Sequence, residues 1–172
     1  FIGGFRHPPN VDAMLWYARE VLPHVRDALP GVKTYVIGGD VPASIKALAA
    51  DDFVVLGHVP DIEPYFESAR ISIAPLRYGA GVKGKINLAM SHGMPVIATS
   101  MAIEGMHLTD GEDVLVADEP RAFAEATRRV YDDEMLWQRL STGGRRNIEQ
   151  YFSRDVARRA LADLLDVATT DA

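Results

Sequence analysis

The sequence predicts an α/β fold, with a Rossmann-like, mainly parallel sheet of about six strands, helices on both faces and a C-terminal helical segment. The first observation is that strand-like and helical segments alternate repeatedly along the chain. The second is that several strand segments are continuous apolar runs, which is typical of parallel strands buried on both faces. The third is that only helical patterns follow Pro120. Alternation of strands and helices indicates βαβ units with right-handed crossovers.

Each expected strand is a short run of β-branched, aromatic or aliphatic residues next to glycine, proline or polar residues. The expected strands are residues 1–5, 34–37, 53–56, 71–76, 95–99 and 114–116. The first run begins at Phe1 and contains a pair of glycines. The apolar composition of these runs predicts a sheet that helices cover.

The first helix is expected from Val11, because apolar residues recur at helical spacing as far as Leu22. Pro23 is expected to kink or end this helix, because proline has no N–H to donate. Asn10 and Asp61 are candidate N-caps, since their side chains can accept from free backbone N–H groups. The remaining helices are expected at 42–50, 62–68, 86–93, 121–132, 134–148 and 154–167.

The chain has 172 residues, no cysteine, and a formal net charge of −6 from 18 basic and 24 acidic residues. We expect a single domain over residues 1–172, since this length buries a core without disulfides or a structural metal. The lack of cysteine excludes thiolate chemistry and fits a reducing compartment, so we expect a cytoplasmic location. The acidic balance argues against a nucleic-acid partner. Because the chain opens at Phe1 within a strand-like run, we expect it to be a fragment of a longer protein.

Glycine-rich loops fall at the predicted carboxyl ends of the strands, where ligands of open α/β sheets bind. The loop at 79–85, with the sequence GAGVKGK, follows a strand and opens a helix. Free N–H groups at a helix N-terminus attract anions, and lysines beside them add positive charge. We therefore interpret this loop as a phosphate site, with candidate residues Gly79, Gly81, Val82, Lys83 and Lys85. The alternative is an ordinary tight turn followed by solvated lysines.

Other charged residues have less specific surroundings. Arg6 follows Gly3 and Gly4 in the first loop, where it is either a diphosphate ligand or a surface arginine. The five histidines lack metal-ligand spacing, so we expect no metal site. Arginines alternate with acidic residues between 128 and 159, which favours solvated helix faces with i,i+4 ion pairs. The alternative is peripheral contact with the inner face of a membrane through its anionic lipids.

Runs that occur in order along the chain resemble a known family. They are FIGGFRHPPNVDA at 1–13, APLRYGAGVKGKINLAMSHGMPVIAT at 74–99, IEGM at 103–106 and DGEDVLVAD at 110–118. They resemble the C-terminal, donor-binding domain of retaining family-4 (group 1) glycosyltransferases. The resemblance implies a GT-B architecture, in which two Rossmann-like domains face a cleft. This chain is then expected to bind a nucleotide-diphosphate sugar, and its partner is the missing N-terminal acceptor domain of the same protein.

The resemblance also implies a diphosphate site and a base site. Gly3 and Gly4 match the turn that approaches the diphosphate. Gly4 stands where many relatives have a phosphate-binding arginine, so Arg6 and Lys83 are expected as substitutes. The base is expected against the loop that contains His58, Val59 and Asp61.

The two glutamates of the family, in a Glu-x7-Glu pattern, align with Ala80 and Leu88 in this chain. In the family the first contacts the sugar and the second the ribose, so Asn87, next to Leu88, is the candidate ribose contact. The expected activity of the full-length protein is hexosyl transfer with retention, in polysaccharide or glycoconjugate synthesis and without an essential metal or other cofactor. The isolated domain is expected to be inactive, because the other half positions the acceptor.

A second function remains open because both glutamates are absent. It is a non-catalytic module of the same fold that binds a nucleotide or another protein. A flavodoxin-like or response-regulator-like domain is disfavoured, because residues 1–10 contain neither an acidic cluster nor a phosphate loop.

Overall fold

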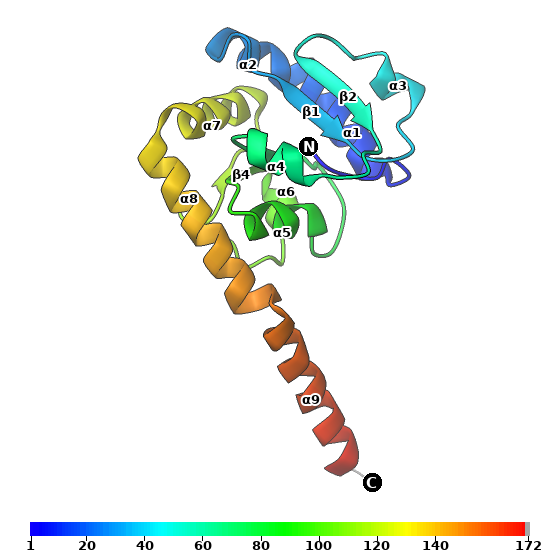
Figure 1. Cartoon of the computed structure of the whole chain (residues 1–172), viewed down its shortest axis with the longest axis vertical. Helices are drawn as coiled ribbons and strands as arrows, with labels where there is room; N and C mark the ends of the chain where they lie inside the picture. Colours follow the sequence, from blue (N-terminus) through cyan, green and yellow to red (C-terminus); the bar gives the residue numbers. More distant parts are fainter. Residues whose placement is uncertain (171–172) are drawn as a thin grey trace.

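The computed structural model describes the backbone of residues 1–170, and side chains as far as residue 163 and at Leu165. Residues 171–172 of the expected domain lie outside the described residues. Helices and parallel strands alternate from the first helix to the last strand, and helices alone follow (Figure 1). The predicted α/β, Rossmann-like fold is therefore confirmed.

The strands form two parallel groups within residues 1–170. In the first group, β1 (Thr34–Ile37) pairs with β2 (Phe53–Gly57). In the second group, the order is β3 (Ser72–Ala74), β4 (Val96–Ala98) and β5 (Leu115–Val116). All three residues of β3 and of β4 are buried, as their continuous apolar runs predict.

The expected first strand is reduced to a single parallel bridge, between Ile2 and Ile37. The amide of Gly3 donates to the carbonyl of Ile37 at 2.9 Å, and the amide of Ile37 donates to the carbonyl of Phe1 at 2.9 Å. A cavity of about 40 Å³ is lined by Ile2, Ile37 and Ser72, so this opening segment lies between β1 and β3. The spatial order is then β2, β1, opening segment, β3, β4, β5, which is the Rossmann order with its switch point beside the opening segment.

Most helices lie where the sequence predicts them, with shifted ends. They are α1 (Pro8–Trp16), η1 (Tyr17–Val21, a π-helical turn), α2 (Leu22–Ala28), α3 (Ala43–Lys46), α4 (Glu63–Ser68), α5 (Gly84–Ser91), α6 (Ser100–Ile103), α7 (Pro120–Asp132), α8 (Glu134–Asn147), η2 (Ile148–Phe152, also π-helical) and α9 (Arg154–Thr170). The short helix α6 has no counterpart among the expected elements. Its N-cap is Thr99, whose hydroxyl accepts from the amide of Ala102 at 3.3 Å.

The first helix differs from its prediction at both ends. It begins at Pro8, because proline is favoured in the first turn, where its missing N–H costs nothing. Asn10 therefore lies inside the helix, and its expected role as N-cap is wrong, since the N-cap is His7. The helix also continues past Pro23, which occupies the first turn of α2 after the π-helical turn η1. A π-helical turn shifts the hydrogen-bond register, which lets the chain continue where proline lacks a donor.

The core joins the first helices to α7. The ring of Phe123, fully buried on α7, meets Trp16 and Tyr17 edge-on at centroid distances of 5.9 and 6.2 Å. The Tyr17 hydroxyl lies 3.1 Å from the Thr34 hydroxyl at the start of β1. Burial raises the pKa of the Tyr17 phenol to about 12, so this group stays protonated and available for hydrogen bonding.

Replacing Tyr17 with phenylalanine is expected to lower the free energy of unfolding by about 1 kcal/mol, because the buried Thr34 hydroxyl loses its partner. Urea denaturation of the two proteins measures the difference. Tyr78→Phe is the control, because the Tyr78 side chain is 45% exposed. An equal loss in both variants would show that the Tyr17–Thr34 contact contributes nothing specific.

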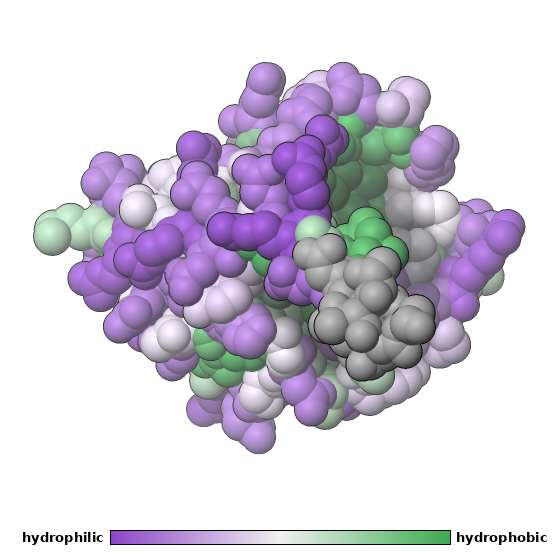
Figure 2. Space-filling model, turned by 90° about the horizontal axis from the view of Figure 1, so that it is seen from below, coloured by the Kyte–Doolittle hydropathy of each residue, from purple (hydrophilic) through white to green (hydrophobic). Residues whose placement is uncertain are grey.

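Helix α9 extends away from the body of the molecule (Figure 1). Its side chains Leu161 and Leu165 are 58% and 60% exposed. The face seen from the α9 end is largely hydrophilic, with smaller hydrophobic areas between the polar side chains (Figure 2). None of the described helices is long and apolar enough to cross a membrane.

Candidate functional site

The loops that follow the opening segment, β1 and β2 meet at one edge of the sheet. The amide of Gly38 donates to the carbonyl of Gly57 at 2.8 Å, and the amide of Phe5 donates to the carbonyl of Gly39 at 3.0 Å. Gly38 has φ of +152°, and a Cβ atom there would lie 2.0 Å from the carbonyl oxygen of Gly3. Only glycine allows Gly38 to lie this close to the Gly3 carbonyl. The loop after β1 is therefore fixed against the opening segment at the carboxyl ends of the strands.

Lys85 brings the N-terminus of α5 to this edge. Its ammonium donates to Oδ1 of Asn10 and lies 4.3 Å from the ring centroid of Phe1. A Cβ atom on Gly3 would lie 2.9 Å from the Lys85 Nζ, so Gly3 must be small for this lysine to reach the opening segment. Burial, reinforced by the charge of Lys83, lowers the pKa of Lys85 to about 8. The candidate residues Gly3 and Lys85 are thus in direct contact.

Lys83 has a different position from Lys85. It is the N-cap residue of α5 and is 8% exposed. Its ammonium donates to the carbonyl of Gly81 at 2.6 Å and to that of Gly79 at 3.4 Å. Lys83 therefore closes the glycine loop on itself, while Val82, the residue before it, is 51% exposed.

The glycine loop depends on backbone conformations that favour glycine. Gly79 has φ of +127° and Gly81 has φ of +76°. Within the described residues, no hydrogen bond engages the amides of Gly84 and Lys85 in the first turn of α5. Free amides at a helix N-terminus attract anions, so the phosphate site at this loop stays a prediction that the geometry allows.

Arg6 lies at the same edge but is engaged by a carboxylate. Its Nε lies 2.9 Å from a carboxylate oxygen of Asp40, and its side chain is 85% exposed. Asp40 has φ of +59° in the loop after β1. The neighbouring Gly4 is exposed, and its carbonyl accepts from Nδ2 of Asn10 at 2.7 Å. Arg6 is thus a surface arginine in an ion pair beside the glycine turn, and its role as a diphosphate ligand stays a prediction.

The candidate base loop follows β2. Gly57 has φ of +72°, His58 is exposed and Val59 is half-buried. The expected role of Asp61 as N-cap of α4 is wrong, because the N-cap is Ile62. The Asp61 carboxylate nevertheless accepts from the amide of Glu63 at 3.0 Å. That carboxylate stabilises the helix from one residue further out than predicted.

The residues that align with the family glutamates are exposed. Ala80 lies in the glycine loop, and Leu88 is 36% exposed on α5. The Oδ1 atom of Asn87, the candidate ribose contact, is buried and has no hydrogen-bond partner. A buried acceptor of this kind carries a free-energy cost unless something donates to it.

Two further arginines, Arg77 and Arg128, are held by carboxylates. Arg77, before the glycine loop, donates through Nε to Asp12 at 2.9 Å and lies over the Trp16 ring, so it ties this loop to α1. In the arginine-rich segment, Arg128 pairs with Glu125 three residues away and with Asp132 four residues away. The predicted i,i+4 pairing on solvated helix faces is confirmed at Arg128.

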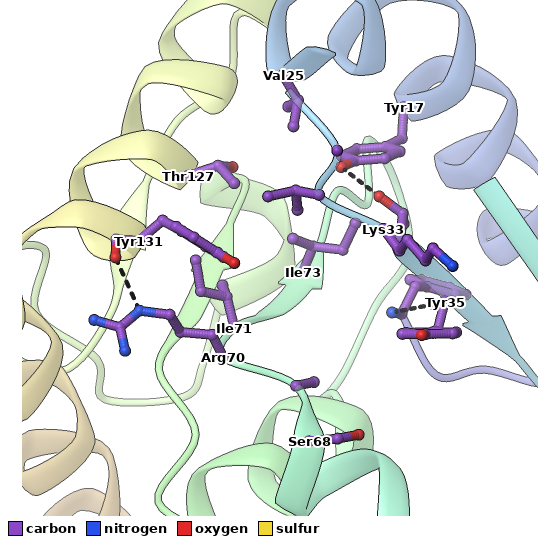
Figure 3. Close-up of a pocket in the computed structure, with 15 residues that line it drawn as sticks. Tyr17, Val25, Lys33, Tyr35, Ser68, Arg70, Ile71, Ile73, Thr127 and Tyr131 are labelled. Carbon is purple, nitrogen blue, oxygen red and sulfur yellow. Dashed lines mark hydrogen bonds between the residues drawn. The ribbon is translucent and has the colours of Figure 1, made fainter. Parts of the chain in front are cut away.

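A larger cavity, of about 290 Å³, lies at the opposite edge of the sheet (Figure 3). Its lining includes Lys33 and Thr34 at the start of β1, and Ile71 just before β3. Figure 3 shows Tyr17 on one side of the cavity, and Arg70 hydrogen-bonded to the backbone of Tyr131 on the other. Phe1, whose ring Lys85 contacts, also lines this cavity, but most of the lining lies away from the carboxyl ends of the strands, where ligands of this fold bind.

Asn10 is the site residue that sequence reasoning missed. It is 4% exposed and contacts both the Gly4 carbonyl and the Lys85 ammonium. The Pro8-Pro9 pair was the available signal, because prolines at the first two helical positions place Asn10 inside the first turn. Over the described residues, no group of three or more His, Asp or Glu side chains has the arrangement of a metal site.

Comparison with known proteins identifies relatives of this chain. The family model described as Glycosyl transferases group 1 matches residues 1–133. A curated relative, an uncharacterized 44.6 kDa protein in the cps region of Klebsiella pneumoniae, is 28% identical over 134 residues. This match covers 73% of this chain and 34% of the relative, so the chain spans about a third of that relative.

Solved structures share the fold at low sequence identity. Anabaena Alr3699/HepE in complex with UDP matches with a TM-score of 0.75 and 15% identity, over 89% of this chain and 46% of that chain. The C-terminal domain of LpcC, a glycosyl transferase group 1 family protein from Francisella tularensis, matches with a TM-score of 0.67 and 15% identity. That match covers 86% of this chain and 82% of that domain. The chain belongs to the group 1 glycosyltransferase family and has the Rossmann-like fold of the C-terminal half of its GT-B members.

Proposed function

We propose that this chain is the donor-binding half of a retaining glycosyltransferase and holds the diphosphate of a nucleotide-sugar between Lys85 and the N-terminus of α5. The observation that carries the proposal is the position of the Lys85 ammonium at the switch point of the sheet. It contacts Asn10 and the Phe1 ring, and within the described side chains it has no carboxylate partner. A half-buried cation without an anion is a favourable place for a phosphate.

The chemistry of the proposed site is electrostatic. When the glycosidic bond breaks, the diphosphate leaving group gains negative charge. The free amides of Gly84 and Lys85 and the Lys85 ammonium are already oriented, so they stabilise that charge without reorganising. Lys83 keeps the glycine loop closed and adds positive charge behind it. No essential metal enters this proposal.

The sugar and nucleoside are assigned to the two sides of this centre. Gly81 and Val82 are exposed and Gly79 is partly exposed, so this loop is assigned to the sugar. The loop of His58, Val59 and Asp61 is assigned to the base, and Asn87 is assigned to the ribose. The acceptor substrate is assigned to a second half of the protein, so this chain alone is expected not to transfer sugar.

Calorimetry of the chain with UDP, GDP and ADP, and with their sugars, tests the proposal. UDP is the first probe, because the similar Anabaena protein was solved in complex with UDP. We expect one of the nucleotides to bind with a submillimolar Kd, roughly −4 to −8 kcal/mol in free energy. The absence of heat with every nucleotide up to millimolar concentration would refute a donor site.

The second candidate function is a nucleotide-binding module without transferase activity. It is favoured by the apolar residues Ala80 and Leu88, at the two positions where the resemblance expects glutamates. Both functions predict nucleotide binding, and only the first predicts turnover. Assaying sugar transfer by the full-length protein distinguishes them, with nucleotide release in the absence of acceptor as the background.

A further inference from the structure

We propose that Asn10 is the positioning residue of the diphosphate site. Its side chain holds the Lys85 ammonium and the Gly4 carbonyl in fixed positions at the switch point of the sheet. This inference rests on the proposed function, because it assigns how the phosphate-binding lysine is held. It adds a residue from α1 to a site otherwise built from the opening segment and the glycine loop.

The geometry of the Asn10 side chain carries the inference. Its Nδ2 donates to the carbonyl of Gly4 at 2.7 Å, and its Oδ1 accepts from the ammonium of Lys85. The two hydrogen bonds use opposite ends of one amide, so the orientation of the amide is fixed. Asn10 is 4% exposed, and a Cβ atom on Gly3 would lie 2.8 Å from its Nδ2. The amide is therefore packed beside Gly3 and shielded from solvent.

Asparagine suits this position because it donates and accepts without charge. An aspartate would pair with Lys85 and cancel the charge that a phosphate requires, and it would place an oxygen against the Gly4 carbonyl. An aliphatic residue would leave the ammonium without an acceptor and the carbonyl without a donor. A neutral amide holds the cation and leaves its charge available to a ligand.

The other charged groups around Lys85 do not take over this role. On α1, Asp12 is paired with Arg77. In the opening segment, Arg6 is paired with Asp40. In the glycine loop, the Lys83 ammonium lies on the carbonyls of Gly79 and Gly81. Among the described side chains, Asn10 is thus the hydrogen-bond acceptor of Lys85.

The test measures the titration of Lys85 and the pH dependence of UDP binding in Asn10→Ala and Asn10→Asp. NMR of ¹³C-labelled lysine reports the Lys85 pKa without any ligand. Losing the acceptor in Asn10→Ala is expected to lower that pKa, and the carboxylate of Asn10→Asp is expected to raise it by about one unit or more. The pH at which UDP affinity falls by half is expected to move in the same two directions. At pH 7, affinity is expected to fall at least about fivefold in Asn10→Ala and tenfold in Asn10→Asp.

Asn147→Ala is the matched control. Asn147 is also 4% exposed, and its Nδ2 also donates to backbone carbonyls, those of Met106 and His107. Its loss is expected to lower stability without moving the Lys85 pKa or the pH dependence of binding. If Asn10 acted in folding alone, Asn10→Ala, Asn10→Asp and Asn147→Ala would all lower stability. All three would then leave the Lys85 pKa and the pH dependence of binding unchanged.

The outcomes separate this inference from the proposed function. If wild-type protein binds no nucleotide, the proposed function fails, whereas the Lys85 titration still tests whether Asn10 holds the lysine. If wild-type protein binds UDP and both Asn10 variants keep its Lys85 pKa and pH dependence, the inference is wrong. Asn10→Asp keeps the size of the side chain, so it carries the test if Asn10→Ala does not fold.

Discussion

Lys85→Met is expected to weaken diphosphate binding by about 10- to 100-fold, the loss that accompanies removal of one charged hydrogen-bond donor from a half-buried site. The ammonium lies where the opening segment, α1 and α5 meet, so no other described side chain replaces it there. Calorimetry with UDP or the nucleotide that binds best measures the change in Kd. Methionine retains much of the aliphatic stem, which separates loss of charge from loss of packing.

The same prediction has a pH dependence with a definite sign. The folded protein holds Lys85 with a pKa of about 8, so the ammonium form that attracts phosphate is depleted as the pH rises above 8. Affinity of the wild-type protein is therefore expected to fall from pH 8 upward, and that of Lys85→Met to stay flat over this range. Lys33→Met is the control, because Lys33 precedes β1 at the opposite edge of the sheet. Equal losses in the Lys33 and Lys85 variants would indicate nonspecific attraction between the protein and the anion.

Gly38→Ala is expected to lower the free energy of unfolding by about 3 kcal/mol or more, through backbone strain and steric overlap together. The added Cβ would lie 2.0 Å from the Gly3 carbonyl oxygen, and φ at this position is +152°. The three nearest atoms are all backbone atoms of Gly3, so a rotamer change cannot relieve the overlap. Urea denaturation measures the loss.

Gly39→Ala is the matched control for this substitution. Gly39 is the next residue, yet a Cβ atom there meets nothing within 4 Å. Gly39→Ala is expected to lower the free energy of unfolding by less than about 1 kcal/mol, within the range of ordinary surface changes. If the two variants lose similar stability, the close approach of Gly38 to the Gly3 carbonyl is not the cause of the loss.

The parallel strands could be predicted because their apolar runs are a local property. The run around Ile97, for example, is apolar throughout and is buried throughout. The opening segment shows the limit of this reasoning, because its apolar residues form only one bridge at Ile2 before glycines redirect the chain. Helix α6 was missed because four residues are too few to show helical periodicity.

The candidate site could be predicted as a set of loops but not as a set of contacts. The sequence places Lys83 and Lys85 two residues apart, and the resemblance singles out Lys83, with Arg6, as the substitute for the family's arginine. The boundary of α5 decides their positions, because Lys83 is the N-cap and folds back, whereas Lys85 lies in the first turn and reaches Asn10. The lysine and asparagine are 75 residues apart in the chain, so their contact depends on the tertiary fold.

The depressed pKa of Lys85 also affects its chemical reactivity. At pH 7 roughly a tenth of a lysine with a pKa of about 8 is the neutral, nucleophilic amine, against well under a thousandth at the ordinary value of 10.5. Mild acylating reagents used at limiting amounts therefore modify such an amine early. A diphosphate in the site would both cover the nitrogen and keep it protonated, so protection from acylation reports occupancy of the donor site without any assay of sugar transfer.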